Sequence, residues 1–201
     1  MAVARHATIE SGHPRPAWLS GELYQFRDRY LEIGGNLVHY VDEGAGSPLL
    51  LLTAGPTWSF LFRNVIREVR GQFRCIALDA PGQGLSEAAP DFPFTIAATS
   101  EVVELFVEAL EVRDLTLLAH DLGGPIGLSM AARRADLIRA LVITDTFCFP
   151  IGDLPRPARM LRFVSGPIFG SLNANFNYLP TSWHGAARDA AGRRRPSGQP
   201  T

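Results

Sequence analysis

The sequence has few of the features that would place it outside the ordinary globular class. Of its 201 residues only Cys75 and Cys148 are cysteines, and each lies in an apolar run, which predicts buried thiols rather than a disulfide framework or a metal site. A net charge of −1 does not suggest a nucleic-acid partner. No segment has the pattern of a signal peptide or the length of a membrane span. We therefore expect a cytoplasmic protein without nucleic-acid or membrane partners.

Hydrophobic residues make up 46% of the chain and charged residues 19%, which is typical of one soluble domain. Residues 1–22 are mostly polar and are predicted to form a flexible arm. Short apolar runs and longer helical patterns then alternate, which predicts an α/β fold with a mostly parallel sheet and flanking helices. The strands are expected at 29–33, 37–41, 49–52, 73–78, 115–119 and 138–144, and the helices at 57–69, 95–110 and from Pro125 to about Ala135.

Local signals refine this outline. Gly34 and Gly35 between the first two strands predict a hairpin turn. In the helix over 57–69, apolar side chains spaced four residues apart predict one buried face, made of Leu61, Val65 and Val69. A threonine before the next helix is a suitable cap. The glycines of the loop at 79–86, Gly82 and Gly84, are expected to adopt positive φ.

The most informative stretch is LTLLAHDLGGPIGL, residues 115–128. An apolar strand leads to Asp121, and small residues two positions before and after it, Ala119 and Gly123, allow close packing behind an exposed side chain. This spacing is typical of a nucleophile elbow, in which the central residue lies between a strand and a helix. A carboxylate there could attack carbon and form an ester, whereas the simpler alternative is that Asp121 only caps the helix. A serine-type esterase is disfavoured because the centre is not serine.

Three motifs in this order resemble the α/β-hydrolase superfamily, and within it the haloalkane dehalogenases and epoxide hydrolases. The first motif follows the strand at 49–52, the second follows the strand at 73–78, and the third is the elbow itself. The resemblance covers about residues 23–150, which we interpret as the N-terminal part of the hydrolase core. The motifs read GPTWSF at 55–60, DAPGQGLS at 79–86 and HDLGGPIGL at 120–128.

The resemblance implies a hydrolase that acts on small apolar molecules through a covalent ester, without cofactor or metal. Asp121 would be the nucleophile, and backbone N–H groups of Gly55 and Leu122 would stabilise the oxyanion. Asp145, which ends the strand after the elbow helix, matches the acid of one dehalogenase branch, although it could equally be an ordinary strand end. His120 is expected on the opposite side of its strand from Asp121.

The motifs also depart from the family pattern. Dehalogenases hold the departing halide with an Asn and a Trp, and Gly55 and Leu122 occupy those places here. Efficient dehalogenation is therefore not expected, because each lost charge-assisted hydrogen bond is worth about 1.5–3 kcal/mol. Epoxides and activated esters, which leave as oxyanions, are the better match. Epoxide hydrolases also use a lid tyrosine, and Tyr178 either fills that role or packs in the core.

The C-terminal part departs further. Residues 151–184 resemble the start of a helical lid, and residues 185–201 have a composition typical of disorder. The last strands and most of the lid are missing from this pattern, which suggests a truncated fold. The family's water-activating histidine is not matched, since His184 does not follow a closing strand, and an ester on the nucleophile is therefore expected to persist. The alternative function is a catalytically inactive fragment or a non-catalytic interaction protein, and the oligomeric state stays open.

Overall fold

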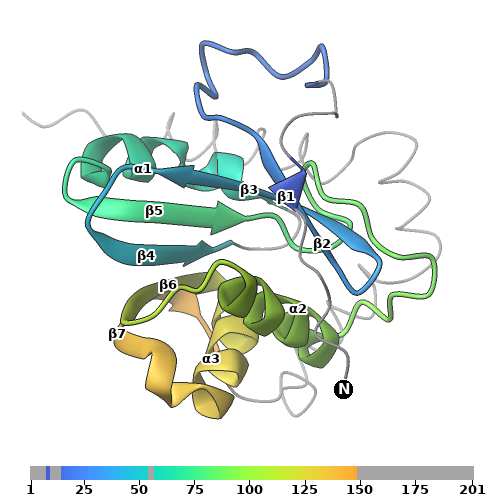
Figure 1. Cartoon of the computed structure of the whole chain (residues 1–201), viewed down its shortest axis with the longest axis vertical. Helices are drawn as coiled ribbons and strands as arrows, with labels where there is room; N and C mark the ends of the chain where they lie inside the picture. Colours follow the sequence, from blue (N-terminus) through green and yellow to red (C-terminus); the bar gives the residue numbers. More distant parts are fainter. Residues whose placement is uncertain (1–7, 10–14, 54–56, 149–201) are drawn as a thin grey trace, which may run out of the picture. The chain divides into compact units, whose positions relative to one another are not determined.

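The computed structural model describes residues 8–9, 15–53 and 57–148, all within the first of the two units into which the chain divides, 1–149. These residues form a seven-stranded sheet in the order β1-β2-β3-β5-β4-β6-β7, flanked by helices (Figure 1). This is the predicted mostly parallel α/β architecture. The strands are β1 (Thr8–Ile9), β2 (Arg29–Ile33), β3 (Asn36–Glu43), β4 (Ser47–Leu52), β5 (Phe73–Leu78), β6 (Leu115–Asp121) and β7 (Ile138–Thr146).

The sheet has an antiparallel and a parallel half. The antiparallel pairs are β1 with β2, β2 with β3 and β3 with β5. The turn between β2 and β3 places Gly34 and Gly35 at φ +56° and +79°, as expected for a hairpin. Strands β5, β4, β6 and β7 run parallel to one another. Their carboxyl ends therefore meet at one edge, where open α/β sheets bind ligands.

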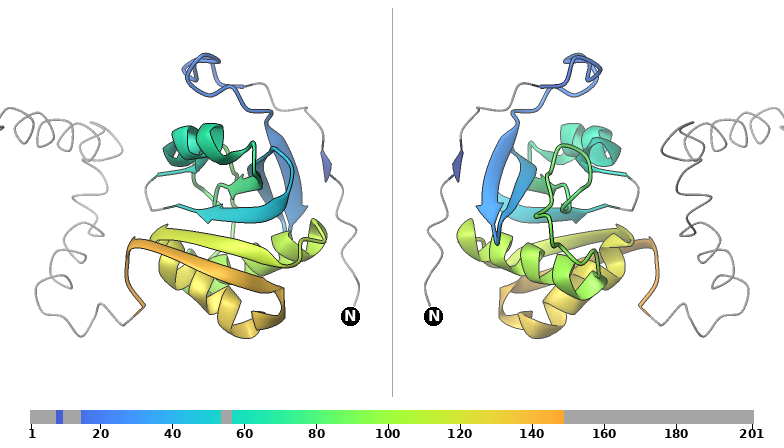
Figure 2. Two further views of the ribbon diagram at one scale, coloured as in Figure 1. Left: turned by 90° about the vertical axis from the view of Figure 1, so that its left-hand side faces the viewer. Right: turned by 90° about the vertical axis from the view of Figure 1, so that its right-hand side faces the viewer.

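Helices cover both faces of the sheet (Figure 2). α2 (Ile96–Ala109) and α3 (Gly123–Arg133) lie side by side on one face, and α1 (Arg63–Val69) lies on the other. The core under α2 includes Val103 and Phe106, and the core under α1 includes Phe62 and Ile66. The Thr95 side chain accepts a hydrogen bond from the N–H of Ala98 at 3.1 Å, as predicted for the cap of α2.

The predicted buried face of the helix over 57–69 is wrong for Leu61 and Val65, whereas the third residue, Val69, is partly buried and packs against the core. Residues Ser59–Phe62 form the 3₁₀ helix η1, and only then does α1 begin. A 3₁₀ turn holds about three residues rather than 3.6, which rotates the side chains that follow. Phe62 and Ile66 are therefore buried, whereas Leu61 and Val65 are 39% and 38% exposed.

The N-terminal segment is more tightly held than expected. Packed structure is found before Leu23, where it was expected to begin. Arg15 donates hydrogen bonds to the carboxylate of Asp28 and to the carbonyl oxygens of Tyr24 and Phe26. Leu19 is only 7% exposed. The polar composition of residues 1–22 predicted a flexible arm, but the hydrogen bonds of Arg15 hold its second half in place. Residues 8–9 also pair with β2 as the short strand β1.

The two thiols also differ from each other. Cys75 is buried in β5 as predicted, but Cys148 is exposed just after β7. The apolar run that contains Cys148 continues β7, whose residues Leu141, Val142 and Ile143 are 41–47% exposed among the described residues. The predicted lid and tail, 151–201, lie outside the described residues. Within the described part of the chain, no helix has the length and hydrophobicity needed to cross a membrane.

Candidate active site

Asp121 is the last residue of β6, and α3 begins two residues later at Gly123. The strand, turn and helix therefore join as the elbow pattern predicts. Asp121 has φ +48°, a left-handed backbone that costs a residue with a Cβ about 1–2 kcal/mol. Its side chain is half-buried, and the positive end of the α3 dipole favours a carboxylate there. Strain of this kind is concentrated at functional turns.

The glycines after Asp121 let α3 approach the sheet closely. A Cβ on Gly123 would lie 2.3 Å from the carbonyl oxygen of Leu52 in β4, and one on Gly124 would lie 1.7 Å from Oγ1 of Thr146 in β7. Neither distance is compatible with a side chain. Thr146 also donates a hydrogen bond to the carbonyl oxygen of Asp121, which fastens the turn to β7.

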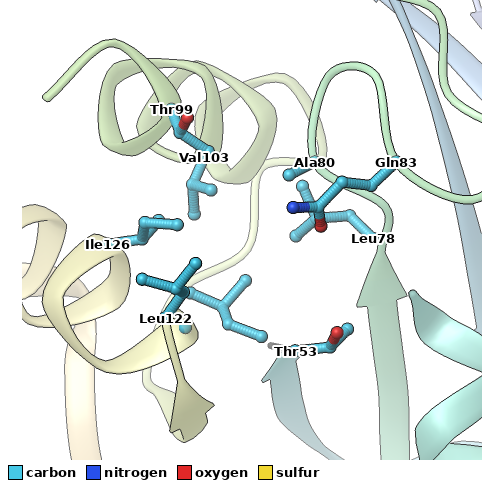
Figure 3. Close-up of a pocket in the computed structure, with 10 residues that line it drawn as sticks. Thr53, Leu78, Ala80, Gln83, Thr99, Val103, Leu122 and Ile126 are labelled. Carbon is cyan, nitrogen blue, oxygen red and sulfur yellow. The ribbon is translucent and has the colours of Figure 1, made fainter. Parts of the chain in front are cut away.

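A small cavity of about 20 Å³ lies beside this turn, between the ends of β4 and β5 and the helices α2 and α3 (Figure 3). Its volume is enough for about one water molecule. Leu122 and Gly123, directly after Asp121, line it, but Asp121 is not among the lining residues. The side-chain amide of Gln83 points into it (Figure 3). The lining consists of Leu52, Thr53, Leu78, Ala80, Gln83, Thr99, Val103, Leu122, Gly123 and Ile126.

Two other predicted site residues, Leu122 and Asp145, lie at the same edge of the sheet. Leu122 caps α3, whose first N–H groups have no partner within the helix. Asp145 is exposed, has φ +41°, and lies in an irregularity where Asp121 pairs with Thr146 and His120 with Thr144. Such bulges re-aim side chains beside functional sites. Gly55 lies outside the described residues.

His120 does not complete a catalytic pair with Asp121. Its Nδ1 lies 3.2 Å from the carbonyl oxygen of Thr144 and 3.3 Å from the hydroxyl of the same residue. The ring is therefore engaged with β7. Tyr178 and His184 lie outside the described residues.

A buried polar chain lies near this edge, and sequence reasoning assigned it no role. Arg15 donates to Asp28 at 2.8 Å, Asp28 lies 3.1 Å from His39 Nε2, and His39 Nδ1 lies 2.8 Å from Asp79 Oδ2. The side chains of His39 and Asp79 are fully buried. The sequence signal was a histidine among the apolar and aromatic residues at 37–41, where it is buried in β3.

Asp79 connects this chain to two loops. Its Oδ1 accepts the N–H of Ser59 at 2.7 Å, at the start of η1, and its Oδ2 accepts the N–H of Leu85 at 3.0 Å. A Cβ on Gly84 would lie 2.2 Å from Asp79 Oδ2, and Gly84 has φ +55° as predicted, with Gly82 at +77°. The carboxylate therefore lies directly beneath the loop that follows β5.

The pKa values of His39 and Asp28 have shifted in the directions that favour their charged forms. Burial alone would lower the pKa of His39, but hydrogen bonds to Asp28 and Asp79 outweigh burial and raise it above its ordinary value. For Asp28, burial acts to raise the pKa, yet hydrogen bonds from His39 and Arg15 bring it below the usual range. Protonated His39 can donate to both carboxylates at once.

A larger surface groove of about 530 Å³ lies at the other end of α2. It is lined mainly by charged residues, of which Arg134 pairs with Glu108, and it contains no elbow residue. No group of three or more potential metal-ligating side chains occurs in the described ranges. The parallel-strand edge around Asp121 therefore remains the candidate site.

A mostly parallel sheet with a strand–turn–helix elbow at Asp121 is the architecture of an α/β hydrolase, and comparison with known families agrees. Residues 47–178 match the family described as alpha/beta hydrolase fold, and the chain belongs to this family. It falls in the branch of haloalkane dehalogenases and epoxide hydrolases, as the following relatives show.

Haloalkane dehalogenase 2 of Mycobacterium tuberculosis (strain ATCC 25618 / H37Rv) is 38% identical over 156 residues, covering 77% of this chain and 54% of the relative. A cis-3-alkyl-4-alkyloxetan-2-one decarboxylase of Shewanella oneidensis is 35% identical over 134 residues, covering 65% and 42%. The chain thus spans about half the length of the curated relatives it matches.

Solved structures give the same branch. The haloalkane dehalogenase DatA from Agrobacterium tumefaciens C58 superposes with a TM-score of 0.66 and 26% identity, covering 77% of this chain and 54% of that one. The epoxide hydrolase CorEH superposes with a TM-score of 0.66 and 28% identity, covering 76% and 57%.

Proposed function

We propose that this chain carries the nucleophile of an α/β hydrolase that opens carbon–oxygen or carbon–halogen bonds in small apolar molecules through an ester on Asp121. The observation that carries this proposal is the left-handed backbone of Asp121 at the junction of β6 and α3. The relatives named haloalkane dehalogenase and epoxide hydrolase support the choice of substrate class.

The chemistry of the first step follows from the nucleophile. An oxygen of the Asp121 carboxylate bonds to the electrophilic carbon, and the bond from that carbon to its leaving group breaks with its electron pair. An alkyl bromide releases bromide, and an epoxide keeps its oxygen as an alkoxide that takes a proton from water. An aryl ester is attacked at its carbonyl carbon and releases phenolate, which leaves a mixed anhydride on Asp121 in place of an alkyl ester. The backbone N–H of Leu122 at the start of α3 is the donor proposed for the oxyanion.

The leaving group distinguishes these substrates. Leu122 presents an apolar side chain to the cavity, so it supplies no side-chain N–H for a halide (Figure 3). Departure of bromide without such donors loses hydrogen bonds worth about 1.5–3 kcal/mol each. Epoxides and activated esters are therefore the preferred substrates. Asp145 on the neighbouring strand is the proposed acid partner, for a histidine that the described residues do not supply.

Intact-mass spectrometry tests this proposal. The full chain is incubated separately with hexyl bromide, hexene oxide and nitrophenyl butyrate, which add different masses to one carboxylate. We expect an adduct on Asp121 that forms faster with hexene oxide or the ester than with hexyl bromide, and that is absent in Asp121→Asn. The Asp145→Asn variant serves as the matched control, because it should still form the adduct. Equal adducts in wild type and Asp121→Asn, or none in either, would refute the assignment.

A further inference from the structure

The buried chain Arg15–Asp28–His39–Asp79 is more extensive than strand pairing requires. In the β3–β5 ladder, Asp79 already donates its backbone N–H to the carbonyl oxygen of His39 at 2.9 Å. The side chains add a second connection at the same register position, and both are fully buried. Burying a charged pair costs free energy unless its hydrogen bonds are complete, so this connection is expensive to keep for strand pairing alone.

The polar chain ends on backbone N–H groups close in sequence to residues that line the cavity, although Ser59 and Leu85 do not line it themselves. Asp79 fixes the N–H of Ser59, six residues after Thr53, and the N–H of Leu85, two residues after Gln83. Thr53 and Gln83 both line the cavity beside the elbow. A movement of the Asp79 carboxylate therefore acts on the start of η1 and on the loop after β5 together.

We propose that His39 is a positioning residue for the reaction at Asp121, acting through Asp79 on the two loops that border the cavity. Only imidazolium has an N–H on both ring nitrogens, so only the protonated form donates to Asp28 and Asp79 together. Neutral His39 keeps one of these bonds and leaves a lone pair facing the other carboxylate. When the remaining proton is on Nε2, Asp79 loses its bond from Nδ1 and is held only by the N–H groups of Ser59 and Leu85, which loosens its position.

The titratable and charged groups around His39 come from the segments on both sides of β3 and from the N-terminal segment. Asp28 precedes β2, Tyr30 lies across the β2–β3 pair with its ring centroid 5.2 Å from that of His39, and Asp79 directly follows β5. Arg15 reaches the ring through Asp28. Burial raises the pKa of Tyr30, so this phenol stays neutral near pH 7. The charge state of His39 is therefore the one in this cluster that changes as the pH rises, and its pKa lies above the ordinary value of histidine.

The kinetic part of this inference rests on the proposed function, and two measurements separate them. The first is hydrogen exchange at the amides of Ser59 and Leu85, which requires no substrate. In His39→Gln we expect exchange at both amides to rise about tenfold, since glutamine cannot bridge two carboxylates with two donors. Asp28→Asn is the second variant and should act in the same direction.

The second measurement is the rate of adduct formation with hexene oxide against pH. Displacement by Asp121 consumes no base, so in wild type the rate should fall as pH rises through the titration of His39. In His39→Gln the rate should be about tenfold lower near pH 6 and should lack this fall, because small misplacements in a site cost one to two orders of magnitude.

Asp42→Asn is the matched control. Asp42 pairs with Arg74 across the same two strands, at 2.9 and 2.7 Å, but contacts neither loop. Its removal should leave both the exchange and the pH profile as in wild type. Unchanged exchange in His39→Gln, or an unchanged pH profile, overturns the inference. Absence of an adduct with every reagent refutes the proposed function alone, because exchange at the two amides still decides whether His39 holds the loops.

Discussion

Substitution of Gly124 by alanine is the sharpest structural test of the elbow. The new Cβ would lie 1.7, 2.7 and 2.9 Å from Oγ1, Cβ and Cγ2 of Thr146. Rotation of the threonine moves its outer atoms but not its Cβ, so α3 and β7 must separate. Overpacking of this kind costs about 1–3 kcal/mol. Loss of the hydrogen bond from Thr146 to Asp121 adds about 1 kcal/mol, for a total of about 2–4 kcal/mol.

A double-mutant cycle measured by urea unfolding checks this value. Thr146→Gly removes all three clashing atoms and alone should cost about 1–2 kcal/mol through the lost bond and backbone entropy. Combined with Gly124→Ala, it should recover at least about 1 kcal/mol relative to the sum of the single changes. Gly21→Ala is the control, because no atom lies within 4 Å of its new Cβ. Additive effects of the pair would show that α3 does not approach β7 as described.

Three further predictions concern other parts of the chain. Folding raises the pKa of His39 and lowers that of Asp28, so the stability that the two groups contribute is complete between about pH 4 and 6.5 and falls on either side. The urea midpoint of the wild type should therefore drop above about pH 6.5, and that of His39→Gln should not. Burial raises the pKa of Cys75 to about 11, so a thiol reagent should label Cys148 and reach Cys75 only on unfolding, whereas rapid labelling of both would contradict the described core. Thr95→Ala should lower the unfolding free energy by about 1 kcal/mol, and an unchanged urea midpoint would argue against the cap.

The predictions from sequence succeeded where the determining residues are neighbours in the chain. Alternating apolar runs predicted the strands, and the small residues around Asp121 predicted a strand, a turn and a helix in the right place. The buried face of the segment at 57–69 was missed because its first turn is 3₁₀, and nothing local in SFLF distinguishes that turn from an α-helical one.

The polar chain was missed for a different reason. Its contacts join residues far apart in sequence: His39 and Asp79 are separated by 40 positions, and Arg15 and Asp28 by 13. No periodicity encodes such pairs, because they form only when β3 and β5 align in register. The same applies to the exposure of Cys148, which depends on β7 lying at the edge of the described sheet rather than on its hydrophobicity.

The left-handed backbone of Asp121 has an evolutionary consequence. Glycine adopts this conformation without penalty, so every lineage has a simple route to a more durable turn that carries no chemistry. An aspartate at this place therefore carries a conformational cost of about 1–2 kcal/mol that glycine would not. Under the proposed function, related genes that lose the demand for the reaction should drift towards glycine here before their cores change.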